Sequence, residues 1–246
     1  TTENNGVVNL YAVWKRRLTV TFNKNGSSSV GSTSVSCTVE SGNTCRVTAP
    51  SITASSGFSV VGWNTSSNAT TSSVNVGGSI EVSNDTTYYA ITKSTNPYTV
   101  TFEGNGASLS SESESCYRYN GASTCNVTTP SITKSGWTIV GWGTSASSTT
   151  RTNAVNTRVS LSSNISRYAV TSKSITITYN ANGGSGAPSA SSKTIYNTAT
   201  SGSITLSSTK PTRTGYTFLG WATSSSASSA TYTACLLYTS PSPRDR

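Results

Sequence analysis

The chain has 246 residues, of which 33% are hydrophobic and only 10% are charged, and 17 Lys and Arg against 8 Asp and Glu give a net charge of +9. It contains no histidine, the commonest general base of enzymes, and no apolar run near the ~18 residues of a membrane-spanning helix. The cations are dispersed apart from Lys15-Arg16-Arg17, which argues against a nucleic-acid surface. Composition therefore predicts no membrane span in this fragment and argues against catalysis and nucleic-acid binding.

The chain repeats itself. Residues 10–14, LYAVW, match the endings YYAI (88–91) and RYAV (167–170), so we interpret residues 1–14 as the C-terminal end of a preceding repeat. Three segments then follow one order: VTF or ITY, Asn-Gly, Pro and Gly-Trp. Their tryptophans are spaced by 79 residues, at Trp63, Trp142 and Trp221. We therefore expect tandem repeats at 15–94, 95–173 and 174–234, the last one truncated.

Each repeat is predicted to be mainly β. LTVTF (18–22) and YTVTF (98–102) alternate polar and apolar residues and stop at a turn signal, and no strong amphipathic helical pattern is present. In CYRYNGASTC (116–125), Asn120-Gly121 suits a two-residue type I′ turn. Counting outward from this turn places Cys116 opposite Cys125 in a non-hydrogen-bonded pair, where side chains approach most closely. That geometry predicts a cross-strand disulfide.

The remaining cysteines of the repeats fit the same interpretation. Cys37 and Cys45 flank a turn, and their odd spacing requires a bulge, which we place at Gly42. The third repeat has no cysteine, and Leu206 stands at the equivalent position, which indicates an apolar contact in place of a covalent one. Metal binding is the alternative, but the cysteine spacings and the missing histidine argue against it. Paired thiols predict an oxidising, extracellular setting.

The most conspicuous motif is GFSVVGW (57–63), which recurs as GWTIVGW (136–142) and GYTFLGW (215–221). The glycine before each tryptophan removes a side chain and permits a bulge or a close backbone approach. We predict that the tryptophans are the largest core residues. The alternative makes them exposed platforms that stack sugar rings, although no acid or amide cluster recurs beside them to bind hydroxyls. Both hypotheses concern the same residues: Trp63, Trp142 and Trp221.

Together, VTFxxNG, a Pro followed by a Gly-aromatic pair, GW and a closing LYAVW resemble the Listeria–Bacteroides repeat, also called the internalin-type B repeat. The match covers residues 1–234, and the motifs recur every 77–81 residues. The resemblance implies small β-grasp-like domains with little or no helix, in tandem on a bacterial surface protein. It also implies that neighbouring repeats of the same chain are partners, between a ligand-binding region and an anchor.

These observations predict a non-catalytic protein region without cofactor or metal. The acids form no recurring pair, and neither a GxSxG elbow nor a phosphate-cradling loop is present. We expect a spacer or presentation stalk at the cell surface, with the export signal and anchor outside this fragment. The alternative is a multivalent adhesive module that binds a glycan or a host-surface protein.

The segment 235–246, CLLYTSPSPRDR, matches nothing else in the chain. It resembles the translation of a transposase-type library adapter, and we interpret it as an adapter-derived artefact; a genuine Pro-rich tail is the alternative. On the first interpretation Cys235, the odd cysteine, is not a candidate reactive thiol.

Overall fold

The structure is a computed structural model that describes residue 6, residues 9–233 and residues 237–241, with the backbone alone described for the last range. The chain divides into two compact units. The first unit contains the chain up to Thr99, Ser115–Asn126 and Ser160–Ser163; the second contains Val100–Glu114, Val127–Val159 and the chain from Asn164 onward. Part of the expected second repeat therefore belongs to the unit that contains the first repeat.

The described residues form strands and no helix, which confirms the mainly β prediction, while a β-grasp arrangement stays a prediction. The strands are β1 (Lys15–Asn23), β2 (Ser29–Val30), β3 (Ser34–Glu40), β4 (Cys45–Thr48), β5 (Ile52–Thr53), β6 (Phe58–Asn64), β7 (Ser79–Val82), β8 (Thr86–Ser94), β9 (Tyr98–Glu103), β10 (Ser108–Leu109), β11 (Ser113–Cys116), β12 (Cys125–Thr128), β13 (Ile132–Thr133), β14 (Thr138–Gly143), β15 (Arg158–Leu161), β16 (Ile165–Ile177), β17 (Ser191–Tyr196), β18 (Ser201–Thr205) and β19 (Leu237–Pro241).

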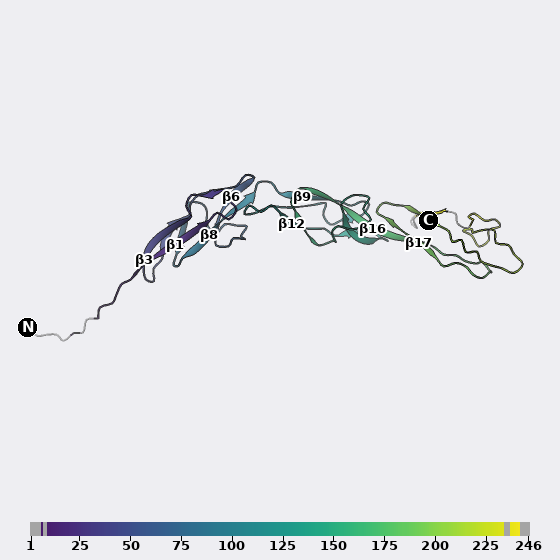
Figure 1. Ribbon diagram of the computed structural model, residues 1–246, viewed down its shortest axis with the longest axis horizontal. Helices are drawn as coiled ribbons and strands as arrows, with labels where there is room; N and C mark the ends of the chain where they lie inside the picture. Colours follow the sequence, from purple (N-terminus) through teal and green to yellow (C-terminus); the bar gives the residue numbers. More distant parts are fainter. Residues whose placement is uncertain (1–5, 7–8, 234–236, 242–246) are drawn as a thin grey trace, which may run out of the picture. The chain divides into compact units, whose positions relative to one another are not determined.

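The first repeat is built on a four-stranded mixed sheet in the order β3-β1-β8-β6 (Figure 1). The two central strands, β1 and β8, are parallel, with Phe22 opposite Tyr88. β3 pairs antiparallel with β1, and β6 pairs antiparallel with β8. Parallel neighbours require a crossover. Here the crossover consists of the short strands and loops between β1 and β8 instead of a helix.

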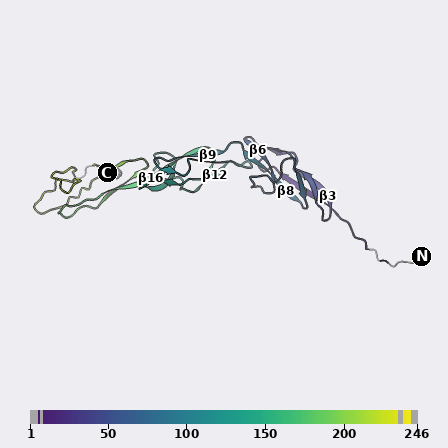
Figure 2. The same cartoon turned by 180° about the vertical axis from the view of Figure 1, so that it is seen from behind.

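The second repeat uses the same strand order, β11-β9-β16-β14, with β9 parallel to β16. The two parallel strands can be followed from both sides in Figures 1 and 2. Short strand pairs accompany the sheets: β2–β5, β4–β7 and β10–β13 are antiparallel, and β12 pairs with β15. In the third repeat β17 pairs with β16, and β18 pairs with β19.

One of the two connections between consecutive repeats contains a proline, and the other does not. β8 ends at Ser94 and β9 begins at Tyr98, and Asn96-Pro97 lies between them. Proline has no N–H for a strand ladder, so it interrupts the strand at this point. The connection to the third repeat has no proline, and β16 runs unbroken through 13 residues, Ile165–Ile177. One strand therefore closes the second repeat and opens the third.

The hydrophobic core of the first repeat follows the alternation seen in the sequence. Leu18, Val20 and Phe22 on β1 are buried, and they pack in one cluster with Trp63 and Ala90. Because successive strand residues point to opposite faces, the intervening threonines lie on the other face of the sheet. The period-2 pattern of LTVTF thus predicted the buried face.

A β-bulge precedes each of the first two tryptophans. The pairing of β6 with β8 shifts register between Val60 and Gly62, and that of β14 with β16 shifts between Ile139 and Gly141. Gly62 has φ = +141°, and a Cβ on it would lie 2.7 Å from the Val74 carbonyl oxygen. Both the backbone conformation and the close approach exclude a side chain here.

We predict that Gly62→Ala lowers the free energy of unfolding by about 3 kcal/mol or more, because it combines a strained φ with a backbone clash. Gly57→Ala is the matched control, since Gly57 also has a positive φ, +77°, but nothing lies within 4 Å of its Cβ position. The control is expected to cost about 1–2 kcal/mol. Urea unfolding of both variants measures the difference, and equal costs would show that the close approach is unimportant.

Candidate functional site

The motifs that recur in the same order in each repeat come together in space around Trp63 in the first repeat. The Trp63 ring lies edge-on to Phe22, the aromatic residue of VTF, with 4.9 Å between ring centroids. Its Nε1–H donates a hydrogen bond of 3.0 Å to the carbonyl oxygen of Pro50. The side chain is 0% exposed. An indole buried with its N–H satisfied is stable in a core and has no free face for a ligand.

Trp142 repeats this arrangement in the second repeat. Its ring centroid lies 4.7 Å from that of Phe102, and its Nε1–H donates to the Pro130 carbonyl oxygen at 3.2 Å. Trp142 is also 0% exposed. The backbone of the following loop folds back onto each tryptophan, as Trp63 N–H donates to Val74 O and Trp142 N–H donates to Asn153 O, both at 2.8 Å. The motif therefore closes a core and a loop together.

Trp221 lies in a different environment. It packs against Tyr179 at 4.9 Å and Phe218 at 5.1 Å, but it is only half-buried and lines a cavity of about 670 Å³. Its Nε1–H is buried without a hydrogen-bond partner in the described structure. In the first two repeats β8 and β16 run through this place, and the described part of the third repeat has no strand there. The cavity therefore lies at the position that β8 takes in the first repeat and β16 in the second.

The burial of the tryptophans bears on the two hypotheses for Gly-Trp. Stacking of sugar rings requires an accessible ring face, which Trp63 and Trp142 do not offer. Trp221 offers a face toward a cavity that carries both polar and apolar side chains. Within the described residues, Trp221 is the one tryptophan closing a GxxxxGW motif that a ligand could reach.

One disulfide lies at the base of a hairpin-like segment in each of the first two repeats. Cys37–Cys45 joins β3 to β4, and Cys116–Cys125 joins β11 to β12. The turn at Asn120-Gly121 has φ values of +54° and +74°, as a type I′ turn requires. Its arms do not form a ladder with each other in the described structure, because β11 pairs with β9 and β12 with β15. The disulfide therefore connects strands of different sheets.

The third repeat has apolar residues where the others have a disulfide. Leu206 is buried, and Ile175, Ile195 and Ile204 form a cluster at the same end of the repeat. A covalent closure of nine or ten residues contributes about 2.5 kcal/mol in the chain-entropy model. Full burial of one such side chain contributes about 1.5–3 kcal/mol, so either solution can hold the segment.

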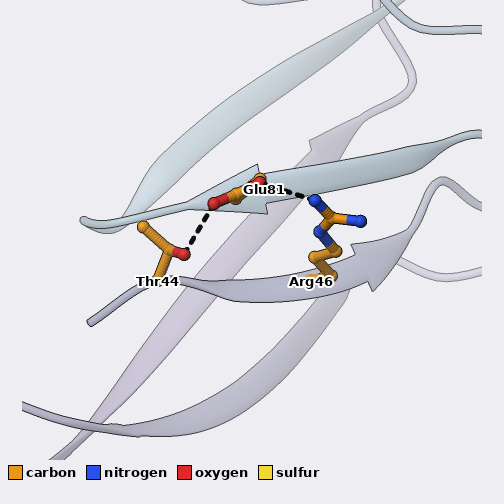
Figure 3. A network of polar contacts seen from close by, with 3 residues as sticks. All are labelled: Thr44, Arg46 and Glu81. Carbon is orange, nitrogen blue, oxygen red and sulfur yellow. Dashed lines mark hydrogen bonds and ion pairs between the residues drawn. The ribbon is translucent and has the colours of Figure 1, made fainter.

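A polar network occurs on the surface of the first repeat (Figure 3). The Thr44 hydroxyl donates to Glu81 at 2.7 Å, and Arg46 forms an ion pair with the same carboxylate at 3.1 Å. Arg46 and Glu81 are directly opposite each other on β4 and β7. The hydrogen bond from Thr44 is the larger cause and the contact with Arg46 the second, and together they hold the pKa of Glu81 below its usual value of 4.5. The network is exposed and has the features of a strand-pairing contact and not of a catalytic carboxylate.

No group of three or more His, Cys, Asp or Glu side chains in the described part of the chain is placed to hold a metal ion. No helix in it is long and apolar enough to cross a membrane.

Repeated mixed sheets, each with a tryptophan at the same position, define a tandem-repeat β protein. A family model, the Listeria-Bacteroides repeat domain, matches residues 19–91, 98–170 and 176–240. The chain therefore belongs to the Listeria-Bacteroides repeat family. Comparisons with curated proteins and with solved structures gave no match. The third match extends into the segment 235–246, whose interpretation as an artefact stays a prediction.

Sequence reasoning did not identify the role of the prolines. Pro50 and Pro130 each supply the carbonyl oxygen that accepts the indole N–H. The signal was present in the sequence, because proline and tryptophan are 13 and 12 residues apart in the two repeats. A nearly constant spacing across a loop indicates a fixed contact between its ends.

We predict that Trp142→Ala lowers the free energy of unfolding by about 3–5 kcal/mol, because it removes a fully buried indole and leaves the Pro130 carbonyl without its donor. Trp221→Ala is the matched control, and its cost is expected to be clearly smaller because Trp221 already faces a cavity. Denaturant unfolding followed by circular dichroism measures both. Equal costs would show that burial does not distinguish the two sites.

The Glu81 network predicts a pH dependence. Because the pKa of Glu81 is lowered on folding, its contribution to stability is present above the unfolded value and is lost as the pH falls below about 4.5. Glu81→Gln should therefore flatten the loss of stability between about pH 5 and pH 3. Glu103→Gln, which changes an exposed carboxylate on β9, is the control. Thermal midpoints measured across this pH range test the prediction, and identical curves for Glu81→Gln and the unsubstituted protein would contradict it.

Proposed function

We propose that this chain is a non-catalytic spacer region of a bacterial surface protein, which extends and presents another domain. The observation that carries this proposal is the burial of Trp63 and Trp142, each with its indole N–H bonded inside the repeat. The most conspicuous recurring motif is thereby accounted for by architecture. Membership in a repeat family that is typical of bacterial surface proteins and is generally non-catalytic supports the same role.

The covalent structure supports an extracellular location. Disulfides persist in oxidising compartments, and this chain has two of them in repeats of only about 79 residues. A domain of this size buries a limited fraction of its surface, so cross-links contribute a large share of its stability. Because the chain has few charged residues, its stability should also depend less on salt concentration.

The second candidate function is adhesion to a glycan or a host-surface protein. The cavity beside Trp221 favours it, because a half-buried aromatic ring next to polar side chains is suited to a sugar ring. The first two repeats offer no equivalent accessible tryptophan in the described structure. A multivalent adhesive would need the site in several repeats, so this observation supports the spacer more than the adhesive.

The test measures binding and presentation together. The soluble chain is titrated onto a glycan array and onto cultured mammalian cells, with a chain lacking residues 95–173 as the matched variant. A spacer shows no saturable binding with either chain. In parallel, a peptide tag ahead of the chain is displayed on polymer-coated beads, and its capture by antibody should increase with the number of repeats. Saturable binding that weakens on deletion of the repeat and on Trp221→Ala would instead establish the adhesive function.

A further inference from the structure

A contact recurs wherever one repeat is followed by the next. The tip of the hairpin-like segment in the second repeat pairs with the end of β8 in the first, where Lys93 forms a bridge with Tyr119 and Ser94 N–H donates to Arg118 O at 2.8 Å. One residue further, Asn120 N–H donates to the Thr92 carbonyl oxygen at 2.9 Å. The second repeat thus forms an isolated β-bridge with the end of β8.

The Asn120 side chain completes this contact. Its Oδ1 accepts a hydrogen bond of 3.1 Å from Thr92 N–H, so that Asn120 binds both backbone groups of one residue. Its Nδ2 donates to the carbonyl oxygens of Ser67 at 2.9 Å and Ala69 at 3.2 Å. Both carbonyls belong to the loop that follows Gly62-Trp63. One amide therefore joins the last strand and the Gly-Trp loop of the preceding repeat.

Asn197 makes the same four hydrogen bonds at the next connection. Its backbone N–H donates to Thr171 O at 2.9 Å, and its Oδ1 accepts from Thr171 N–H at 3.0 Å. Its Nδ2 donates to Ala146 O at 3.0 Å and Ser148 O at 2.9 Å. Each of these partners lies 79 residues after its equivalent in the first contact, since 67, 69 and 92 become 146, 148 and 171. Two independent copies of one geometry indicate a built contact.

An aromatic contact accompanies each asparagine. The Arg118 guanidinium lies over the Tyr98 ring at 4.3 Å and over the Phe58 ring at 5.2 Å, where Phe58 is the first aromatic residue of GFSVVGW. In the next connection Trp137, the equivalent of Phe58, packs against the cluster that contains Ile175 and Ile195. Tyr216 holds this position in the third repeat and is 68% exposed.

The Asn25-Gly26 turn of the first repeat and the Asn120-Gly121 turn of the second also approach each other closely. A Cβ on Gly26, in the turn of the first repeat, would lie 2.1 Å from the carbonyl oxygen of Asn120. Gly183 holds the same place in the third repeat with the same φ, +87°, and the nearest atom to its Cβ position is 3.6 Å away. Gly26 therefore faces a docked segment, and Gly183 does not among the described residues.

We propose that Asn120 and Asn197 are recognition residues, through which each repeat docks on the repeat that precedes it. The docking surface is formed by the loop after Gly-Trp and by the end of the last strand, and its partner is a turn that carries asparagine at positive φ. Ser115–Asn126 accordingly belongs to the same compact unit as the first repeat. The inference goes beyond the proposed function, since a spacer could equally consist of uncoupled repeats.

The simpler explanation is that asparagine only supplies the left-handed conformation of the turn, with φ = +54° at Asn120 and +56° at Asn197. Glycine adopts that conformation without strain. Asn→Gly therefore retains the turn and removes only the amide. On the simpler explanation the substitution leaves the preceding repeat unaffected, and on the docking proposal it exposes the strand end of that repeat.

Hydrogen exchange on the full chain distinguishes the two. Asn120→Gly should speed exchange of the Thr92 amide by about tenfold or more and leave that of Thr171 unchanged, while Asn197→Gly should do the reverse. The matched control is Asn156→Gly, since Asn156 is exposed in a turn with φ = +55°. It should change neither amide. Equal Thr92 exchange in Asn120→Gly and Asn156→Gly would overturn the proposal.

A second pair of variants approaches the contact from the other side. Gly26→Ala places a methyl group against the Asn120 carbonyl and should also speed exchange at Thr92, whereas Gly183→Ala has the same φ and should not. Because these substitutions leave the second repeat intact in sequence, they test docking even if Asn120→Gly unfolds that repeat. Unchanged Thr92 exchange in Gly26→Ala would contradict the proposal.

Discussion

The structure depends on one close approach, that of the returning loop to the Gly-Trp bulge. The Val74 carbonyl oxygen lies only 2.7 Å from the position that a Cβ of Gly62 would take, so the loop can hydrogen-bond to Trp63 on both its N–H and its C=O. The bulge directs the indole into the core, where it contacts Phe22 and reaches the Pro50 carbonyl. The separate motifs of the sequence are thus parts of a single contact, which explains why they occur together and in a fixed order.

The sequence predicted local features well. Alternation identified the buried face of β1, and Asn-Gly identified a turn with two positive φ values. It did not predict the strand neighbours, because sheet pairing joins residues far apart in the chain. The arms around Asn120 were expected to pair with each other, yet each pairs with another strand, and the tip pairs with the preceding repeat. A turn signal specifies the conformation of its own residues and not the partners of its arms.

The connections between repeats vary in chemistry where the geometry allows alternatives. Arg118 and Ile195 stand at equivalent positions of the second and third repeats. Arg118 makes a cation–π contact with Tyr98, and Ile195 belongs to the aliphatic cluster against which Trp137 packs. A proline interrupts one connecting strand and not the other. The asparagine is the same at both, because an amide offers two donors and one acceptor in one plane, a combination that no other small side chain at positive φ provides. Ser41, which stands at the position of Asn120 in the first repeat, donates its backbone N–H to Trp14 O at 3.0 Å, so the same backbone hydrogen bond is present there without the amide.

The two ends of GxxxxGW have different roles, which answers what the motif does. In the first two repeats its tryptophan lies in the core of its own repeat, and its first aromatic residue contacts the next repeat. In the first repeat both positions lie on β6, and in the second Trp137 directly precedes β14, which carries Trp142. The loop that follows each of these strands accepts the asparagine. Displacement of the strand would therefore disturb the core and the connection together. This arrangement couples the packing of one repeat to the docking of the next.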